Sequence, residues 1–215
     1  MTSSFLLAVA LSMAPLPPIP ALCADLPADP GDPEEYRELW EDGQSWEAFL
    51  ADAENRRDLW LENWAESEGL DPALVARATA AGGTWYILAV AVDACSDSVS
   101  TIPFLARLAE RVEGLELRIV DSDAGAWIME ENPTPDGRPA TPTVVLLTPE
   151  FEQRGCFIER PTPLQTRVIE NPDGLDQRGL YEFKMEWYAD DAGATTAAEF
   201  VEILEAAAAG GVRCG

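Results

Sequence analysis

The sequence predicts an α/β protein in which helices flank a mixed sheet, with a helical extension on the N-terminal side. Apolar runs of strand length alternate with segments whose apolar residues recur every three or four positions, which is the pattern of strands and helices in turn. The last two expected strands are separated only by a short turn, which joins antiparallel neighbours, whereas strands separated by a helix pair in parallel. A sheet that contains both kinds of pairing is mixed.

The first 24 residues carry no charged side chain and are expected to form a signal peptide. Their apolar centre is residues 5–11, and Ala21-Leu-Cys-Ala24 is similar to a small-residue cleavage site. Prolines interrupt the apolar run too early for a membrane-spanning helix, so we expect no membrane insertion after cleavage. The expected location is extracytoplasmic, either periplasmic or secreted. Cys23 leaves a lipoprotein as an alternative. Because no Lys or Arg lies near the start, a disordered or wrongly started N-terminus is the alternative to a signal peptide.

Two further segments precede the main domain, which is expected over residues 70–215. Residues 25–33 contain three prolines and a glycine, which deny them regular structure and predict a linker. Residues 34–69 carry aromatic and aliphatic side chains at helical spacing and predict a helical extension, whose tryptophans we expect in packing. Asp71 followed by Pro72 is typical of a helix start, with Asp as the N-cap and Pro in the first turn.

The remaining elements are read from apolar runs and helical periodicity. Residues 85–92 form a continuous apolar run, which suits a strand buried on both faces of a sheet. The helix that begins after Cys95 has one apolar face and ends near Gly114. Further strands are expected at residues 115–120, 143–147 and 155–159, the last two joined by a turn at residues 148–150, and a final helix at residues 196–209 capped by Thr195 or Thr196.

The composition excludes several classes of function. The formal net charge is −25, from 14 basic and 39 acidic residues, so nucleic acids and anionic membrane surfaces are not expected partners. Histidine is absent, which excludes Ser-His-Asp hydrolysis, Cys-His proteolysis and histidine-ligated metals. The four cysteines, at positions 23, 95, 156 and 214, are too far apart in sequence for a Cys-x-x-Cys zinc half-site. We expect no metal and no cofactor.

Cys95 is the residue that points to chemistry, because it lies where the apolar run of residues 85–92 gives way to a helical pattern. A thiol at the start of a helix faces backbone N–H groups and the positive end of the helix dipole, and both favour the thiolate. Asp93 and Asp97 flank this thiol, and their negative charges oppose the thiolate. No Lys or Arg lies close to Cys95 in sequence, which argues against a thiol peroxidase.

The order of these pieces resembles the thioredoxin superfamily, and in particular bacterial thioredoxin-like proteins whose motif reads Trp-Cys-Gly-Asp followed by Ala, Ser or Cys. The resemblance runs from Leu70 to about Leu204. The segments that carry it are Leu70-Asp71-Pro72, Ala94-Cys95-Ser96-Asp97-Ser98, Ile102-Pro103-Phe-Leu-Ala-Arg-Leu-Ala-Glu110, Arg118-Ile-Val-Asp-Ser-Asp123, Thr141-Pro142 and Trp187-Tyr188.

The resemblance implies roles for particular residues and also departs from the family pattern. It implies that Cys95 is the nucleophile and that Thr141 and Pro142 form a cis-proline loop that holds the substrate. Ala94 stands where the family has tryptophan, and Ser98 stands where a second, resolving thiol would lie. The chain therefore has a CxxS motif, which cannot close a disulfide within itself.

The expected function is thiol-disulfide exchange through Cys95 and the CxxS motif, on a protein or a low-molecular-weight thiol or disulfide. The alternative is a redox-inactive module that keeps the thioredoxin fold for binding or structure. Export would permit disulfides, which makes Cys156 and Cys214 candidates for a structural bridge. Either of them, if the fold brought it near Cys95, would instead be a candidate remote resolving thiol.

Overall fold

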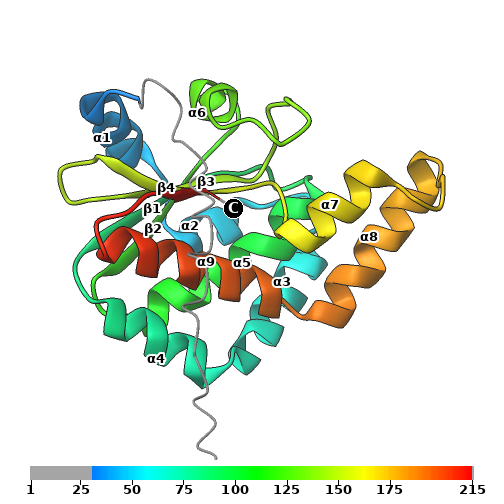
Figure 1. The fold of residues 1–215 in the computed structure, drawn as a ribbon, viewed down its shortest axis with the longest axis horizontal. Helices are drawn as coiled ribbons and strands as arrows, with labels where there is room; N and C mark the ends of the chain where they lie inside the picture. The colour runs from blue at the N-terminus through cyan, green and yellow to red at the C-terminus, as the bar shows by residue number, and fades with distance from the viewer. Residues whose placement is uncertain (1–30, 215) are drawn as a thin grey trace, which may run out of the picture.

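A computed structural model describes residues 31–214 and shows one five-stranded sheet with helices on both faces (Figure 1). The strands lie in the order β2-β1-β3-β4-β5. β1 is parallel to β2, β3 is antiparallel to both β1 and β4, and β4 is parallel to β5. The predicted α/β fold with a mixed sheet is confirmed. The strand bounds are β1 (Trp85–Val90), β2 (Leu115–Val120), β3 (Thr143–Leu147), β4 (Gln153–Ile158) and β5 (Arg213–Cys214).

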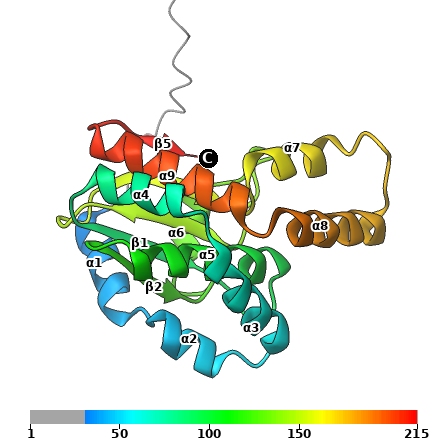
Figure 2. The ribbon, with the colours of Figure 1, turned by 90° about the horizontal axis from the view of Figure 1, so that it is seen from below.

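Two hydrophobic clusters, one on each face of the sheet, bind the helices to it. One face carries α1 (Pro33–Asp42) and α6 (Ala126–Glu131). The other carries α2 (Trp46–Asp52), α3 (Arg57–Glu66), the 3-10 turn η1 (Ser67–Gly69), α4 (Pro72–Ala81), α5 (Ser96–Arg111) and α9 (Ala194–Ala208). α7 (Thr162–Glu170) and α8 (Gln177–Asp191) extend to one side of the sheet, as Figure 2 shows. Among these described helices, none combines the length and apolar character needed to cross a bilayer.

The continuous apolar run of β1 reflects burial on both faces of the sheet. Ile87 and Ala89 belong to the cluster under α5 and α9, whereas Leu88 and Val90 belong to the cluster under α1 and α6. All four side chains are fully buried. A strand in this position cannot alternate apolar and polar residues, because it has no solvent-exposed face.

The predicted element bounds differ from the observed ones by a few residues. β1 ends at Val90, two residues before the predicted end, and β4 begins at Gln153, two residues before the predicted start. The predicted turn at residues 148–150 extends to Glu152, whose carbonyl accepts from the Thr148 amide. Asp71 caps α4 and Pro72 is its first residue, as predicted. Most of the expected linker lies outside the described residues, and α1 already begins at Pro33, because a proline is tolerated in the first helical turn.

The predicted cap of the last helix is wrong. α9 begins at Ala194, after Ala192 and Gly193, which both have positive φ, so Thr195 and Thr196 lie inside the helix. The Thr195 amide donates instead to the carboxylate of Asp191, four residues earlier, at 3.0 Å. The tight turn between α8 and α9 brings that carboxylate into the place where a threonine hydroxyl was expected.

The expected helical extension is packed against the sheet. Trp46, Phe49 and Trp60 belong to the same core cluster as residues of β1 and α5. The indole N–H of Trp60, which is fully buried, donates to the backbone carbonyl of Asp93 at 3.0 Å. The Asp93 carboxylate accepts from the amides of Glu54 and Asn55 at 2.9 and 2.8 Å. The loop before α3 is thereby attached to the loop that follows β1.

We expect Trp60→Ala to lower the free energy of unfolding by about 3–5 kcal/mol, because it removes a buried aromatic ring and leaves a cavity. Equilibrium denaturation of the full chain measures this loss. The control is Leu61→Ala, at the next position of α3, where the side chain is 44% exposed and the expected change is within about 0.5 kcal/mol. Equal losses in the two variants would contradict the packing role of Trp60.

We expect Asp93→Asn to destabilise the protein at neutral pH and to have little effect in acid. Partial burial of Asp93 acts to raise its pKa, but hydrogen bonds from Asn55 and Glu54 outweigh it and hold the pKa below the ordinary value of 3.8. A carboxyl whose pKa is lower in the folded state contributes stability above its unfolded pKa and loses it as the pH falls through the folded pKa.

The expected loss for Asp93→Asn is about 1 kcal/mol at neutral pH, the scale of an ordinary hydrogen bond, because the Asp93 carboxylate is only partly buried and water screens its charge. Denaturation at neutral pH and at a pH well below 3.8 checks the prediction, because the two chains should converge in acid. A difference that stayed constant with pH would assign the loss to packing and not to the charge of Asp93.

Candidate functional site

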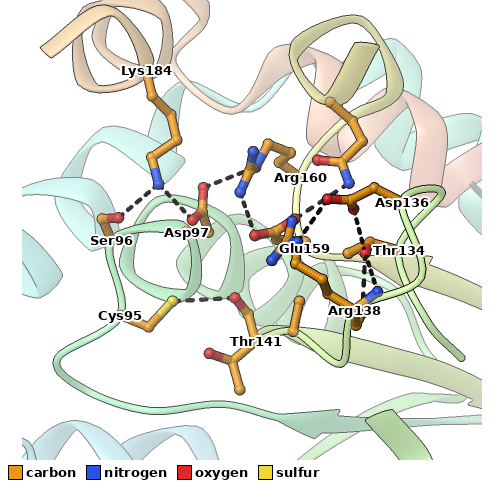
Figure 3. A network of polar contacts seen from close by, with 12 residues as sticks. Cys95, Ser96, Asp97, Thr134, Asp136, Arg138, Thr141, Glu159, Arg160 and Lys184 are labelled. Atoms are coloured by element: carbon orange, nitrogen blue, oxygen red, sulfur yellow. Dashed lines mark hydrogen bonds and ion pairs between the residues drawn. The ribbon is translucent and has the colours of Figure 1, made fainter. Parts of the chain in front are cut away.

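Cys95 is the N-cap residue of α5, immediately after the turn that follows β1 (Figure 3). The Ser98 amide donates to the Cys95 sulfur, with a distance of 3.5 Å between N and Sγ. Cys95 is partly exposed and is the free cysteine among the described residues. The sequence therefore placed the thiol correctly at a strand-to-helix junction, with its sulfur at the N-terminal end of a 16-residue helix.

The second component of the site is the loop before β3. The peptide bond between Thr141 and Pro142 is cis, and the Thr141 carbonyl oxygen lies 3.1 Å from the Cys95 sulfur. The Pro142 carbonyl accepts from the Glu159 amide at 2.7 Å, which connects this loop to the end of β4. The fold thus brings together Cys95, Thr141 and Pro142, which the resemblance implied as neighbours.

Ser98 lies one turn into α5 and is completely buried. Its hydroxyl has no hydrogen-bond partner among residues 31–214. The group of Ser98 that hydrogen-bonds to the sulfur is its backbone amide. Ser98 therefore acts on the Cys95 sulfur through its backbone N–H group in the first turn of α5.

The two candidate bridge cysteines lie elsewhere in the sheet. Cys156 in β4 and Cys214 in β5 form a disulfide with each other. Neither is therefore a free thiol available to resolve a mixed disulfide at Cys95. Cys23, the other cysteine of the sequence, lies outside the described residues.

Asp97 is buried, but its carboxylate is paired with cationic and donor groups. The ammonium of Lys184 lies 2.6 Å from Asp97 Oδ2 and also donates to the Ser96 hydroxyl at 2.9 Å. The Tyr188 hydroxyl donates to Asp97 Oδ1 at 2.8 Å, and Arg160 Nε lies 3.4 Å from the same oxygen. From the sequence, the negative charge of Asp97 was expected to disfavour the Cys95 thiolate. Lys184 and Arg160 largely compensate that charge.

Tyr188 acts as a donor in this group. Burial raises the pKa of Tyr188 well above its ordinary value of 10.0, and the neighbouring charge of Asp97 raises it further. The phenol therefore stays protonated at neutral pH and holds the carboxylate in place. Lys184 and Tyr188 both come from α8, so that helix supplies two of the partners of Asp97.

The network continues from Asp97 toward the cis-proline loop (Figure 3). Arg160 pairs with Glu159 as well as with Asp97, and both Arg160 and Glu159 are 6% exposed. Glu159 Oε2 also accepts from Arg138 and from Gln165, each at 3.2 Å. The ion pairs of the network join three carboxylates to three cations and balance in charge: Asp97, Glu159 and Asp136 with Lys184, Arg160 and Arg138.

Arg56 is a further basic residue at the motif that the sequence did not indicate. Its Nε donates to the carbonyl of Ala94 at 2.7 Å, and its Nη1 donates to the Tyr181 hydroxyl at 3.1 Å. Arg56 and Lys184 lie far from Cys95 in sequence, and the fold carries both to residues adjacent to it. The one available signal was that Lys184 is the only lysine in the chain.

The site has no metal-binding character within the described residues. No group of three or more Cys, Asp, Glu or His side chains there is arranged to hold a metal ion. The chemistry that the site offers is that of one thiol beside a cis-proline loop and a charge-balanced network.

Comparisons with known proteins agree with this arrangement. A family model described as Thioredoxin matches residues 43–173. A solved structure of a protein of unknown function from Pseudomonas aeruginosa is 23% identical, with a TM-score of 0.61, covering 80% of this chain and 98% of that chain. An HIV epitope-scaffold is 21% identical, with a TM-score of 0.61, covering 79% of this chain and 97% of that chain. Among curated proteins, none matches.

At such identities the two solved structures support the fold alone, whereas the family model spans more than half of the chain. That match begins at residue 43, within the segment expected to be an extension, which accords with the packing of α2 and α3 into the core. The order of the elements, the thiol at the start of α5 and the cis-proline loop beside it fit the same family. The chain therefore belongs to the thioredoxin family.

Proposed function

We propose that the protein carries out thiol-disulfide exchange through Cys95 alone, as a CxxS member of its family. The observation that supports this is the surroundings of the sulfur: a partly exposed thiol at a helix N-terminus, next to the Thr141–Pro142 loop. No other described cysteine is free, so the proposal is limited to single-thiol chemistry.

In the proposed reaction, the Cys95 thiolate attacks one sulfur of a substrate disulfide. A bond forms between Cys95 and that sulfur, the substrate S–S bond breaks, and the departing thiolate takes up a proton from water. A second thiol, from the substrate or from a low-molecular-weight compound, then attacks the mixed disulfide and releases Cys95. The complete cycle either isomerises the substrate disulfide or transfers it to the second thiol, without a resolving cysteine in the motif.

The charge balance around Asp97 supports this reading. An uncompensated carboxylate next to the motif would disfavour a thiolate, but Lys184 and Arg160 offset its charge. The Asp93 carboxylate is similarly engaged, by the amides of Asn55 and Glu54. The positive end of the α5 dipole and the Ser98 amide therefore favour the Cys95 thiolate, and they are opposed by less negative charge than the sequence suggested.

One observation favours the alternative, a redox-inactive binding module. The Thr141 carbonyl lies 3.1 Å from the Cys95 sulfur, and a carbonyl oxygen accepts a hydrogen bond from a protonated thiol but repels a thiolate. A thiol held in this contact would react slowly, and the same contact would occupy the Thr141 carbonyl. The two functions therefore differ in whether this contact opens when a disulfide approaches.

We expect Ser98→Cys to increase disulfide reductase activity strongly and Cys95→Ser to abolish it. A thiol one helical turn after Cys95 attacks the mixed disulfide intramolecularly, at a high effective concentration. Reduction of insulin by dithiothreitol, catalysed by each chain, measures both effects. Ser98→Ala is the matched control, because it changes the same buried hydroxyl without adding sulfur, and no gain is expected from it.

The decisive outcome is a Ser98→Cys chain that forms the motif disulfide but gains no activity. Peptide mapping without reductant shows whether that disulfide has formed. In that case the surface around Ala94 and Thr141–Pro142 does not accept substrates, and the binding module would replace the proposed function.

We also propose that the protein is exported, on the basis of its uncharged, apolar first 24 residues. The disulfide between Cys156 and Cys214 is compatible with an oxidising compartment. We expect the mature chain from a bacterial host to begin after Ala24, as measured by N-terminal sequencing and intact mass. A lipid-modified chain beginning at Cys23 would indicate the lipoprotein alternative, and an intact Met1 in the cytoplasm would contradict export.

A further inference from the structure

Tyr181 is an exposed aromatic side chain of α8 that lies beside the motif. It is 41% exposed, and the other large apolar side chains of the described residues with comparable exposure, Leu61 and Ile169, are aliphatic. The Tyr181 hydroxyl accepts a hydrogen bond from Arg56 Nη1 at 3.1 Å, and the centre of the Tyr181 ring lies 5.8 Å from Arg56 Cζ. The hydroxyl is thus engaged within the protein, and the exposed side chain is available to another molecule.

Arg56 joins Tyr181 to the peptide group that precedes Cys95. Arg56 Nε donates to the Ala94 carbonyl at 2.7 Å, and that carbonyl belongs to the same peptide group as the Cys95 nitrogen. Because a guanidinium is planar and rigid, the two contacts of Arg56 hold the Tyr181 hydroxyl at a fixed place relative to this peptide group. Within residues 31–214 Arg56 forms no ion pair, so its side-chain contacts are those that bridge Ala94 and Tyr181.

A second contact holds the same face of α8 against the residue that follows Cys95. Lys184 lies three positions after Tyr181, on the same face of the helix. The Lys184 ammonium donates to Ser96 Oγ at 2.9 Å, as Figure 3 shows. α8 is therefore attached to the residues on both sides of Cys95, and the face that carries Tyr181 is the one turned toward the motif.

The backbone of Arg56 adopts a conformation that arginine does not favour. Its φ is 52° and its ψ is 24°, in the left-handed region where glycine and asparagine are the usual residues. Arg56 is the N-cap of α3 but makes no side-chain capping bond, so capping does not explain an arginine here. Strain of this kind persists where surrounding contacts fix it, and it is frequent at functional sites. The contacts of the side chain with Ala94 and Tyr181 account for an arginine at this position.

The two side chains favour an aromatic partner. Ala94, the residue before Cys95, is exposed but offers only a methyl group as contact surface. Tyr181 offers an aromatic ring, which gains from edge or offset contact with a second ring. Arg56 is exposed as well, and a guanidinium is attracted to the face of a ring. An aliphatic side chain of similar size gains neither interaction.

The charges beside the motif select neither an acidic nor a basic partner at close range. Lys184 is paired with Asp97. The Asp93 carboxylate, which is bound by two amides of the loop that leads to Arg56, offsets the charge of that arginine. At long range the net charge of −25 repels acidic segments. The partner is therefore an aromatic residue in a neutral or basic segment.

We propose that Tyr181 determines substrate specificity by contacting an aromatic side chain next to the half-cystine that reacts with Cys95, and that Arg56 positions Tyr181 for this contact. The inference rests on the proposed function for its disulfide and specifies the class of substrate: disulfides flanked by an aromatic residue. The substrate ring packs against the Tyr181 ring and the Arg56 guanidinium.

The test uses the symmetric disulfides of acetyl-Cys-Phe-amide and acetyl-Cys-Leu-amide, and of the same two peptides with the residue order reversed. All are uncharged, and within each order the leaving thiols differ only in the neighbouring side chain. The rate of mixed-disulfide formation is followed by mass spectrometry of the peptide that contains Cys95. We expect the Phe disulfide to react about three- to fivefold faster than the Leu disulfide in at least one order, the scale of one aromatic pair.

Four variants assign the preference to the ring of Tyr181 and to its position. Tyr181→Leu keeps an apolar side chain but removes the ring, so it should abolish the preference for Phe and leave the rate of the Leu disulfide unchanged. Tyr181→Phe keeps the ring and should retain the preference. Arg56→Gln removes the bridge to Ala94 and should reduce the preference. Ile169→Ala truncates an equally exposed side chain, on α7, and is the control that should retain it.

A preference for Phe that survives in Tyr181→Leu would overturn the inference, as would equal rates for Phe and Leu in the wild type in both orders. If the wild type forms no mixed disulfide with any of the peptides, the proposed function fails separately. In that case alkylation of Cys95, which needs only the thiol, decides on Tyr181. The rate with iodoacetanilide relative to iodoacetamide should be higher in the wild type than in Tyr181→Leu, and equal ratios in the two chains would overturn the role of the ring.

Discussion

The burial of the Asp97 carboxylate is the constraint that organises one side of this molecule. An ionised carboxylate that is 4% exposed is costly unless cationic and donor groups surround it. Those groups come from two distant parts of the chain, Lys184 and Tyr188 on α8 and Arg160 after β4. The Asp97 carboxylate, in the first turn of α5, therefore has its partners only when α8 and the end of β4 are in place. The packing of these elements also orders the surroundings of the thiol.

A second set of polar contacts fixes the other side of the motif. The loop before α3 donates two amides to the Asp93 carboxylate, Trp60 donates to the Asp93 carbonyl, and Arg56 donates to the Ala94 carbonyl. The residues on both sides of Cys95 are thus attached to separate elements of the fold. Such support on two sides restricts the position of the sulfur, which is the condition for reproducible chemistry at a single side chain.

The sequence predicted those parts of the fold that depend on local pattern. The apolar run at β1, the amphipathic face of α5 and the Asp71 cap are each readable from neighbouring residues, so the position of Cys95 could be inferred. The family resemblance supplied Thr141 and Pro142, which no local pattern connects to Cys95.

The parts that escaped prediction depend on partners far away in sequence. α8 is anchored near the thiol by Lys184, 87 residues from Asp97, and ion pairs of that kind leave no periodic signal. β5 has two residues, which is too short for a strand pattern, and is attached to β4 through the Cys156–Cys214 bridge. The expectation that the charge of Asp97 opposes the thiolate did not include its pairing with Lys184 and Arg160, for the same reason.

The burial of Lys184 has a consequence for the chemical reactivity of the whole protein. Its side chain is only 12% exposed and is ion-paired, and the sequence has no other lysine. Apart from the N-terminal amine, the protein therefore offers amine-directed reagents no readily accessible target. Acylation of Lys184 would require the contact between α8 and the first turn of α5 to open, so its rate reports how often that helix separates from the thiol site.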